Sequence, residues 1–385
     1  MSDSGRDAAR RLRIAQVAPP LEAVPPIAYG GTERIVAELV QELDRRGHHV
    51  TTFASGDSRI PGAHVVTVPE ALRPTGFSDD PTIYFDETVR MVLDRANDFD
   101  LIHGHLDRWN LDLVRQAGIP VVSTFHGRLD VPWARAAFAA FADLPTGLVA
   151  VSQDQARVHP EADWTVIHHG MTYGLPPLPA TLGEDFCFVG RITPEKGILD
   201  AIEIARLTGR RLLVAAKVAT SEIEIDYEDA VVKPALARAD VTMLGELSDP
   251  ERDLLVASSR AALIPSAWPE PFGLVVIEAL ACGTPVLARR SGAIPELVRD
   301  GIDGFIGDDA QQLAYFDHRL DDLDRAEIRR SALERFSVAR MVDSYEAVYR
   351  RLLAMRWRPA RSSGRGPCRR RSRPAPRRGP PGQPR

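Results

Sequence analysis

The sequence predicts an α/β protein in which two similar open domains, each built on a parallel sheet, follow one another along the chain. Three observations predict this fold. Short apolar runs alternate with amphipathic helical stretches, which is typical of β-α-β units. The alternation stops once, near the middle of the 385 residues, where Pro176, Pro177 and Pro179 interrupt it. It then restarts with enough strands for a second sheet.

The first half opens with a strand, a helix and a second strand. Arg13–Pro19 is the first predicted strand, and a loop rich in Pro and Gly separates it from a helix over Thr32–Arg46 with one apolar face. Gly47 ends this helix, and His49–Ala54 is the next strand. Further apolar runs predict strands at His64–Val68, Leu101–His105, Pro120–Phe125, Leu148–Val151 and Thr165–His168.

The second half repeats the alternation after the proline-rich segment. It predicts strands at Phe186–Val189, Arg211–Ala216, Val241–Leu244, Ala261–Ile264 and Pro285–Ala288. Helices are predicted between them at Lys196–Thr208, Pro250–Ser259 and Leu274–Ala281. Helices from Asp308 to about Met355 close the ordered part.

These boundaries divide the chain into six parts. Residues 1–12 form a flexible N-terminus, 13–170 the first domain, 171–182 a linker, 183–340 the second domain, 341–355 a closing helix and 356–385 a disordered tail. The tail holds eleven arginines and no acidic residue, which leaves 37 basic and 53 acidic residues in the rest of the chain. It could tether the protein to an anionic membrane or a nucleic acid. The reading we favour is an extension with no specific role, since no aromatic or amphipathic spacing interrupts the arginines.

Composition excludes several classes of protein. No run approaches the roughly 18 apolar residues that span a bilayer, and Met1–Arg13 lacks the apolar core of a signal peptide. The three cysteines, Cys187, Cys282 and Cys368, are scattered and odd in number, which argues against a disulfide scaffold. We therefore expect a cytoplasmic protein with no specific nucleic-acid partner and at most a peripheral membrane contact through the tail.

Gly30 and Gly31 form the first candidate motif, within Tyr29–Glu33 at the turn between the first strand and the first helix. Two glycines allow the backbone to approach a ligand, and a helix N-terminus offers unpaired N–H groups to a phosphate. The full dinucleotide fingerprint is missing, which weakens an NAD interpretation. Simple turn chemistry explains such a pair equally well.

The second motif runs from Val189 to Gly197. Gly190 and Arg191 leave a strand end, and Lys196 follows five residues later at a helix start. Ligands of open α/β domains bind beyond the carboxyl ends of the strands. There, a guanidinium and an ammonium group would suit a diphosphate. Each residue alone could equally be a solvated surface cation.

The third motif pairs Glu270, in a loop stiffened by Pro269 and Pro271, with Glu278 on the following helix. At a rise of about 1.5 Å per residue, the helix carboxylate lies about one turn in, so the two carboxylates can face one pocket. A carboxylate can accept two hydrogen bonds from a vicinal diol, which suits sugar and ribose hydroxyls. The alternative is a helix-dipole role for Glu270 and a surface role for Glu278.

Together these motifs make the chain resemble the family 4 retaining glycosyltransferases, which are similar to glycogen synthase. The segment PEPFGLVVIEALACGTPVLARRSGAIPELV carries the two glutamates with seven residues between them, as in that family's signature. The other two motifs fall in the expected order, and the resemblance covers about Arg13 to Met355. It implies two Rossmann-like domains of GT-B type facing a cleft, an acceptor domain followed by a nucleotide-sugar domain, with the last helix crossing back to the first domain.

The resemblance also implies roles for the carboxylate motif. Glu278 would bind the ribose hydroxyls, and Glu270 would contact the transferred sugar. Backbone N–H groups of Phe272, Gly273 and Leu274 would assist Glu270.

Four further positions gain roles in the same way. Arg191 and Lys196, beside Gly190, would neutralise the diphosphate, and Gly31, next to Gly30, would approach it from the other domain. His126 matches a histidine that borders the sugar and the acceptor. A hydrogen-bonded loop histidine without a ligand is the alternative for His126.

Some positions depart from the family pattern. His168-His169-Gly170-Met171 stands where many members have Pro-Asn-Gly-Val, which puts a contact at that loop in doubt, and Lys217 replaces a Gly-rich turn. No Asp-x-Asp occurs where a divalent ion would bridge phosphates, so we expect no metal and no other cofactor. We expect His103 and His105 to face opposite sides of a strand, which argues against a zinc pair.

The sequence therefore predicts transfer of a hexosyl unit from a nucleoside diphosphate sugar to an unknown hydroxyl acceptor, with retention. A sugar-nucleotide epimerase and a catalytically inactive sugar-nucleotide-binding protein remain alternatives. A glycosidase also needs two carboxylates, but it does not account for the cations of the second motif. Acceptor choice would rest on loops 69–81 and 127–134. Trp133 and Phe138 could stack on a sugar or a lipid there, although we favour packing within a helix.

Overall fold

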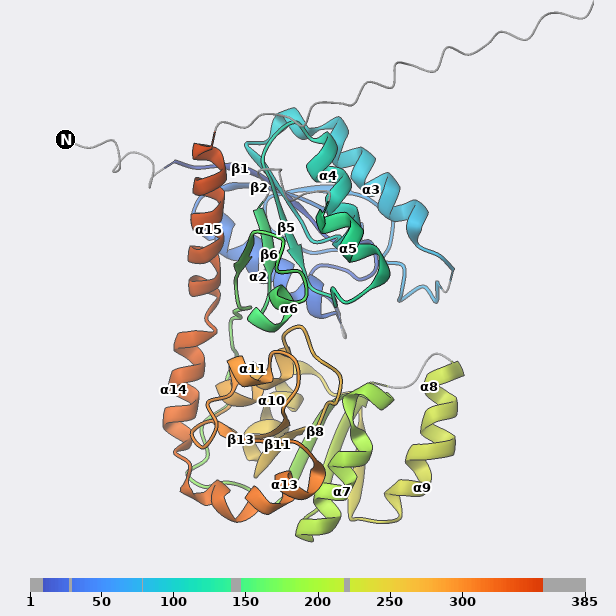
Figure 1. Ribbon diagram of the computed structural model, residues 1–385, viewed down its shortest axis with the longest axis vertical. Coiled ribbons are helices and arrows are strands. Elements are labelled where there is room, and N and C mark those ends of the chain that lie inside the picture. The colour runs from blue at the N-terminus through green and yellow to red at the C-terminus, as the bar shows by residue number, and fades with distance from the viewer. Residues whose placement is uncertain (1–9, 28–29, 78, 140–146, 218–221, 356–385) are drawn as a thin grey trace, which may run out of the picture.

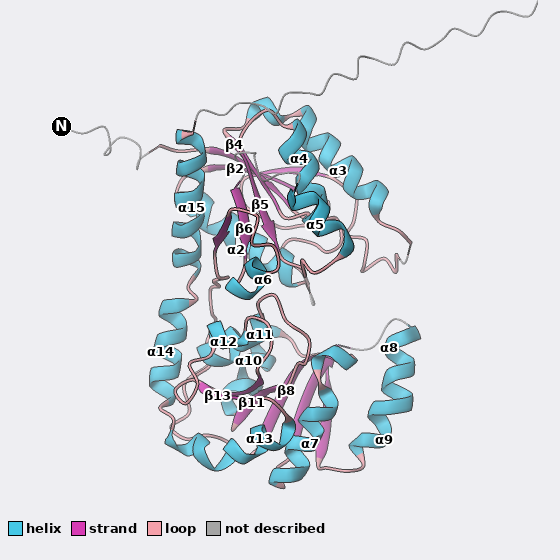
Figure 2. Cartoon of the chain, viewed as in Figure 1, coloured by secondary structure: helices cyan, strands magenta, loops and turns pink. Residues whose placement is uncertain are grey.

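The computed structural model describes residues 10–27, 30–77, 79–139, 147–217 and 222–355. Two parallel sheets, one in each half of the chain, carry helices on their faces, and the halves lie one above the other in Figure 1. Figure 2 shows the same alternation of helix and strand in both halves. The predicted α/β class and the two parallel sheets are confirmed.

The N-terminal sheet has seven strands in the order β3-β2-β1-β4-β5-β6-β7. Its strands are β1 (Arg13–Val17), β2 (His49–Ala54), β3 (Ala63–Val66), β4 (Leu101–Gly104), β5 (Val121–Phe125), β6 (Gly147–Ala150) and β7 (Trp164–Val166). The accompanying helices are α2 (Gly31–Arg45), α3 (Thr82–Asp94), α4 (Asn110–Gln116), α5 (Pro132–Ala139) and α6 (Gln153–Arg157). The central strands are buried on both faces, as parallel strands usually are.

The C-terminal sheet has six strands in the order β10-β9-β8-β11-β12-β13. Its strands are β8 (Phe186–Arg191), β9 (Leu212–Lys217), β10 (Val241–Gly245), β11 (Ala261–Ile264), β12 (Val286–Arg289) and β13 (Gly304–Gly307). The helices are α7 (Ile198–Thr208), α8 (Glu222–Tyr227), α9 (Lys233–Leu236), α10 (Asp249–Ser258), α11 (Leu274–Ala281), α12 (Ile294–Leu297), α13 (Ala310–Tyr315), α14 (Arg325–Arg335) and α15 (Val338–Ala354). Residues 172–185, all of which the structure describes, form neither helix nor strand.

The last helix returns to the first sheet, as predicted. α14 packs on α11 of the C-terminal half, and α15 continues upward in Figure 1 to pack on α2 and β6. Tyr345 and Tyr349 of α15 are fully buried. One apolar cluster accordingly runs from the N-terminal sheet through α15 into α11 and α12. This shared core fixes the two halves around the space between them.

Several predictions differ from the structure. β13 was not predicted, because only four residues, GFIG, follow a glycine-containing turn. The predicted helix over Lys196–Thr208 begins at Ile198 instead, because Pro194–Lys196 forms a short 3-10 turn that ends at Gly197 in a left-handed conformation.

Tyr29, the tail from Arg356 and residues 1–9 lie outside the described residues. Among the described residues, no helix is long and apolar enough to cross a membrane.

The prediction for His103 and His105 was wrong. The two rings lie 4.2 Å apart, centroid to centroid. Side chains alternate along a strand, so residues two apart share a face. Within the described part of the chain, no group of three or more His, Cys, Asp or Glu side chains could hold a metal ion.

Candidate active site between the two sheets

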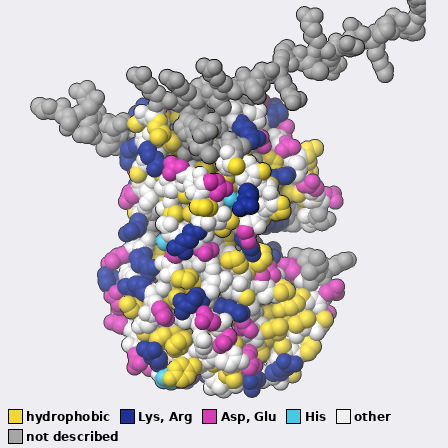
Figure 3. Space-filling model, viewed as in Figure 1, with side chains coloured by type: hydrophobic (Ala, Val, Ile, Leu, Met, Phe, Trp, Pro, Cys, Tyr) yellow, Lys and Arg dark blue, Asp and Glu magenta, His cyan; other side chains and the backbone are white. Residues whose placement is uncertain are grey.

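A pocket of about 740 Å³ lies where the carboxyl ends of the two sheets face each other. A notch between the two halves is visible at the right of Figure 3. Residues from both halves line the pocket. They include all eleven predicted site residues: Gly30, Gly31, His126, Gly190, Arg191, Lys196, Glu270, Phe272, Gly273, Leu274 and Glu278.

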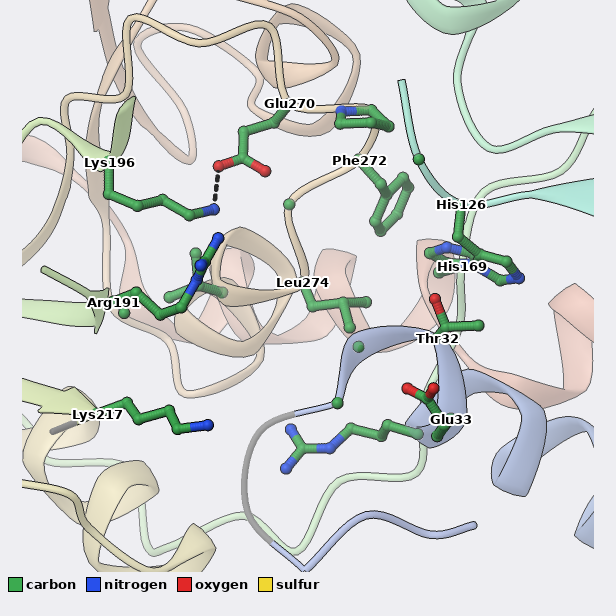
Figure 4. A pocket seen from close by; sticks show the side chains of 18 of the residues that line it. Thr32, Glu33, His126, His169, Arg191, Lys196, Lys217, Glu270, Phe272 and Leu274 are labelled. Carbon is green, nitrogen blue, oxygen red and sulfur yellow. Dashed lines mark hydrogen bonds and ion pairs between the residues drawn. The ribbon is translucent and has the colours of Figure 1, made fainter. Parts of the chain in front are cut away.

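The cations of the second motif lie on the C-terminal wall. Arg191 ends β8, and Lys196 follows in the short turn before α7. Gly197 allows this turn, because a Cβ there would lie 2.4 Å from the Pro265 carbonyl oxygen. In Figure 4 the Arg191 and Lys196 side chains extend toward the same space, and Lys217 at the end of β9 extends toward it from below. The wall therefore brings together cations from two neighbouring strands, and Glu224, which also lines it, lies 3.3 Å from the Arg191 guanidinium.

Glu270 faces these cations. Its carboxylate forms an ion pair with Lys196, drawn as the dashed line in Figure 4. The loop that carries it is held by its backbone, since Ala293 N–H donates to the Glu270 carbonyl at 3.0 Å. Gly292 permits this approach, because a Cβ there would lie 2.4 Å from that same oxygen. The loop therefore holds Glu270 beside Lys196 and at the edge of the cavity.

The N-terminus of α11 opens onto the pocket. Gly273 precedes the helix with φ of 104°, and no side chain caps the helix N–H groups. Phe272 is buried, and its ring packs against His169 at 4.8 Å and also against Phe336. Unpaired N–H groups and the helix dipole give this end a partial positive charge. An anion placed here would meet the helix N-terminus and the two cations together.

Glu278 lies one turn into α11 and is paired with two arginines that the sequence motifs did not indicate. Arg34 of α2 donates to its Oε1 at 2.6 Å, and Arg252 of α10 lies 3.3 Å from the same oxygen. Arg34 also donates to Asp249 at 2.9 Å. A carboxylate has about four acceptor positions, so hydroxyl groups can still bind beside the arginines. Arg34 directly follows Thr32 and Glu33 in the glycine motif, and that adjacency was the available signal.

Gly30 and Gly31 bring the N-terminal half up to the α11 loop. A Cβ on Gly31 would lie 3.6 Å from Leu274 Cδ1. Gly30 has no room for a side chain, because a Cβ there would lie 2.7 Å from Pro26. The first motif therefore closes the pocket over the start of α11.

His126 follows β5 and is held by a chain of buried side chains. Its Nε2 lies 2.9 Å from His105 Nδ1, and His105 Nε2 lies 3.0 Å from Gln16 Oε1. The Gln16 oxygen only accepts, so His105 carries its proton on Nε2 and accepts at Nδ1. His126 must then donate through Nε2, which leaves its Nδ1 as an acceptor. Desolvation lowers the pKa of His126 to about 3, so the ring is neutral near neutral pH.

Asp107 supports the His126 loop and has an unusual backbone. It is the one non-glycine residue of the described chain with a positive φ, 47°. Its carboxylate accepts from the backbone N–H groups of His126 and Gly127, while burial raises its pKa. Gln155 donates to the Gly127 carbonyl at 2.6 Å from the other side. Asp107 also lines the pocket, so a strained residue positions the edge of the site.

Glu33 is another pocket residue that the sequence motifs did not single out. It lies in the first turn of α2, is 3% exposed and points into the cavity in Figure 4. Desolvation raises its pKa to about 7, and Arg73 opposes this only partly. Over the described ranges, no cation forms an ion pair with this carboxylate. Strongly perturbed pKa values cluster at functional sites.

Two of the positions that depart from the family pattern, His169 and Lys217, also line the pocket. His169 stacks on His126 with ring centroids 5.2 Å apart, and Lys217 lines the opposite wall. His168 turns away to Glu296, at 3.1 Å. Glu296 in turn accepts from the backbone N–H groups of Gln153 and Asp154 at the start of α6, so this loop also ties the two halves together.

Two family models match the chain. The model described as Glycosyltransferase Family 4 matches residues 29–172, and the one described as Glycosyl transferases group 1 matches residues 180–334. The chain belongs to the family 4 glycosyltransferases. Its two sheets and returning helix form the GT-B fold of these enzymes.

Two curated relatives of this glycosyltransferase are matched over nearly their whole length. An α-maltose-1-phosphate synthase of Mycolicibacterium smegmatis is 27% identical, with 86% of this chain and 97% of the relative covered. A D-inositol 3-phosphate glycosyltransferase of the same species is 29% identical, with 87% and 91% covered. These relatives place the chain among enzymes of carbohydrate biosynthesis.

Solved structures agree on the fold. AviGT4, a glycosyltransferase involved in avilamycin A biosynthesis, is 27% identical, with a TM-score of 0.66 over 89% of this chain and 98% of that chain. HepE of Anabaena, solved in complex with UDP-glucose, is 20% identical, with a TM-score of 0.66 over 88% and 99%. At 20% identity, the structural similarity to HepE supports the fold of this chain and nothing further.

Proposed function

We propose that this glycosyltransferase moves a hexosyl unit from a nucleoside diphosphate sugar to a hydroxyl acceptor, with retention at the anomeric carbon. One observation carries the proposal. Arg191, Lys196 and the uncapped N-terminus of α11 meet at one end of a single pocket, and the Glu278 carboxylate lies one turn further along α11. That order suits a diphosphate followed by a ribose.

The proposed chemistry follows from the charges. As the bond from the sugar to the diphosphate breaks, negative charge grows on the leaving group and the sugar gains oxocarbenium character. Arg191, Lys196 and the α11 N–H groups would stabilise the leaving group without reorganisation. The neutral His126 would accept a hydrogen bond from a sugar hydroxyl through Nδ1. Glu270 would orient the transferred sugar from the opposite side.

We propose that no metal ion takes part. The protein itself supplies positive charge where the leaving diphosphate would lie, through Arg191, Lys196 and Lys217. A divalent ion serves that purpose in many phosphoryl- and glycosyl-transfer sites. Turnover should therefore be unchanged by EDTA.

The test is a donor screen on the full chain. We expect at least one of the UDP-, ADP-, GDP- or dTDP-hexoses to raise the thermal midpoint, since ligand at 100 times its Kd adds about 2.7 kcal/mol of stability. That donor should release its nucleoside diphosphate in EDTA, with a retained anomeric configuration by NMR. A product that is an isomeric sugar nucleotide would indicate an epimerase. Binding without turnover would indicate an inactive sugar-nucleotide-binding protein.

A further inference from the structure

A second groove joins the pocket on the N-terminal side. It has a volume of about 880 Å³, and Asp107, Trp109, His126, Gly127 and Pro271 line both cavities. The groove therefore begins at the residues that border the proposed reaction centre and leads away from the cations that would hold the diphosphate. Ligand pockets usually occupy roughly 300–1,000 Å³, so this groove has room for more than one hexose.

Three tryptophans line the groove from separate elements. Trp109 follows β4, Trp133 lies in the first turn of α5, and Trp268 lies two residues before Glu270. Trp268 is 42% exposed and Trp133 is half-buried. The favoured packing is confirmed for both residues, because Phe138 is buried and the Trp133 ring lies 6.1 Å from the Phe138 ring, centroid to centroid. Trp133 also lines the groove.

Guanidinium groups lie over two of these rings. The Arg128 guanidinium lies 4.0 Å from the centre of the Trp268 ring and forms an ion pair with Asp130. Arg108 covers one ring of the groove, since its guanidinium lies 4.0 Å from the centre of Trp109. Trp109 is fixed by stacking on Phe85 and by donating to Asp86 at 2.9 Å. The groove therefore combines indole rings with guanidinium donors and carboxylate acceptors.

This pattern fits one chemical class of ligand. A sugar ring has apolar C–H faces that stack on indoles and hydroxyl edges that bond to Arg and Asp. A lipid chain would need a continuous apolar surface, which the charged side chains interrupt. A nucleic acid would need an excess of positive charge, whereas Arg108 and Arg128 are balanced by Asp107 and Asp130.

We propose that this groove is the acceptor site and that the acceptor is a glycan of at least two sugar units. This inference rests on the proposed function, because the groove meets the donor pocket at His126. The terminal sugar would present its hydroxyl between His126 and Asp107, and the following unit would stack between Trp133 and Trp268. Because Trp268 belongs to the donor loop and Arg128 to the opposite half, glycan binding also bridges the two halves.

The test is binding of the fluorescently labelled full chain to an array of immobilised mono- and oligosaccharides, with phosphatidylglycerol vesicles as a second probe. We expect retention on at least one oligosaccharide and weaker binding of its monosaccharide. Trp133→Ala and Trp268→Ala should each weaken this binding at least about fivefold, because a stacking contact is worth roughly that factor. Trp133→Phe and Trp268→Phe should keep most of it. Tyr315→Ala, an exposed aromatic outside the groove, is the matched control and should change nothing.

Three results would overturn the proposal: binding to no oligosaccharide, equal binding by the alanine variants, or retention by the vesicles alone. Nucleoside diphosphate binding by each variant is measured in parallel by thermal shift. Unchanged nucleotide binding shows that the variants fold and separates failure of the groove from failure of the donor pocket. If the wild type itself bound no nucleoside diphosphate, that result would count against the proposed function instead.

Discussion

Replacing Lys196 with alanine is expected to lower nucleotide-sugar turnover roughly 10²–10³-fold, the cost of removing one preorganised group that stabilises developing charge. Lys196 lies in the turn beyond β8 with its ammonium group at the pocket wall, in contact with Glu270. The loss should appear in kcat, because the charge on the leaving diphosphate grows only as the bond breaks.

Steady-state kinetics with the donor found in the screen measures this effect. Lys233→Ala is the matched control, since Lys233 is also a C-terminal-half lysine in an ion pair but is exposed on α9. The double variant Lys196→Ala/Glu270→Gln separates two explanations. Recovery of turnover would mean that the single variant failed only because Glu270 lost its partner. Near wild-type turnover in Lys196→Ala would remove this lysine from the mechanism.

Replacing Glu33 with glutamine is expected to make the protein's stability less dependent on pH. In the wild type, Glu33 should lower the free energy of unfolding by about 3 kcal/mol as the pH rises, which changes the folding equilibrium constant roughly 10²-fold, and Glu33→Gln should remove this loss. Burial raises the pKa of Glu33 from 4.5 to about 7. As the pH rises, the unfolded chain therefore releases this proton before the folded chain does. The stability present below pH 4.5 is lost as the pH rises through about 7.

Urea unfolding at pH 5 and pH 8 compares the two proteins. Glu33→Gln should lose less stability than the wild type between these values, whatever constant offset the substitution introduces. Glu70→Gln, at an exposed glutamate, should follow the wild type. Identical pH dependence in Glu33→Gln and wild type would show that Glu33 is ionised in the folded protein.

Much of the fold was predictable because apolar periodicity is a local property. β2, β11 and α11 begin and end at the predicted residues. The short β13 escaped prediction, since a four-residue strand that begins and ends with glycine carries no period. The error at His103 and His105 was one of strand geometry and concealed the hydrogen-bonded chain that holds His126.

The candidate site was predictable where its residues form contiguous motifs. All eleven of the proposed residues line one pocket, because each motif follows the carboxyl end of a strand or opens a helix. Arg34, Arg252 and Asp107 were missed, because their importance depends on contacts with residues in other segments of the chain. Arg34 and Glu278 are 244 positions apart in the chain. That Trp133 and Trp268 line one groove was hidden for the same reason.

The most direct test of the donor site is a crystal structure of the protein with the nucleoside diphosphate that gives the largest thermal shift. We expect the diphosphate to contact Arg191, Lys196 and the N-terminus of α11, and the ribose hydroxyls to bond to Glu278. A nucleotide bound elsewhere, or one whose diphosphate makes no contact with Arg191 or Lys196, would contradict this expectation.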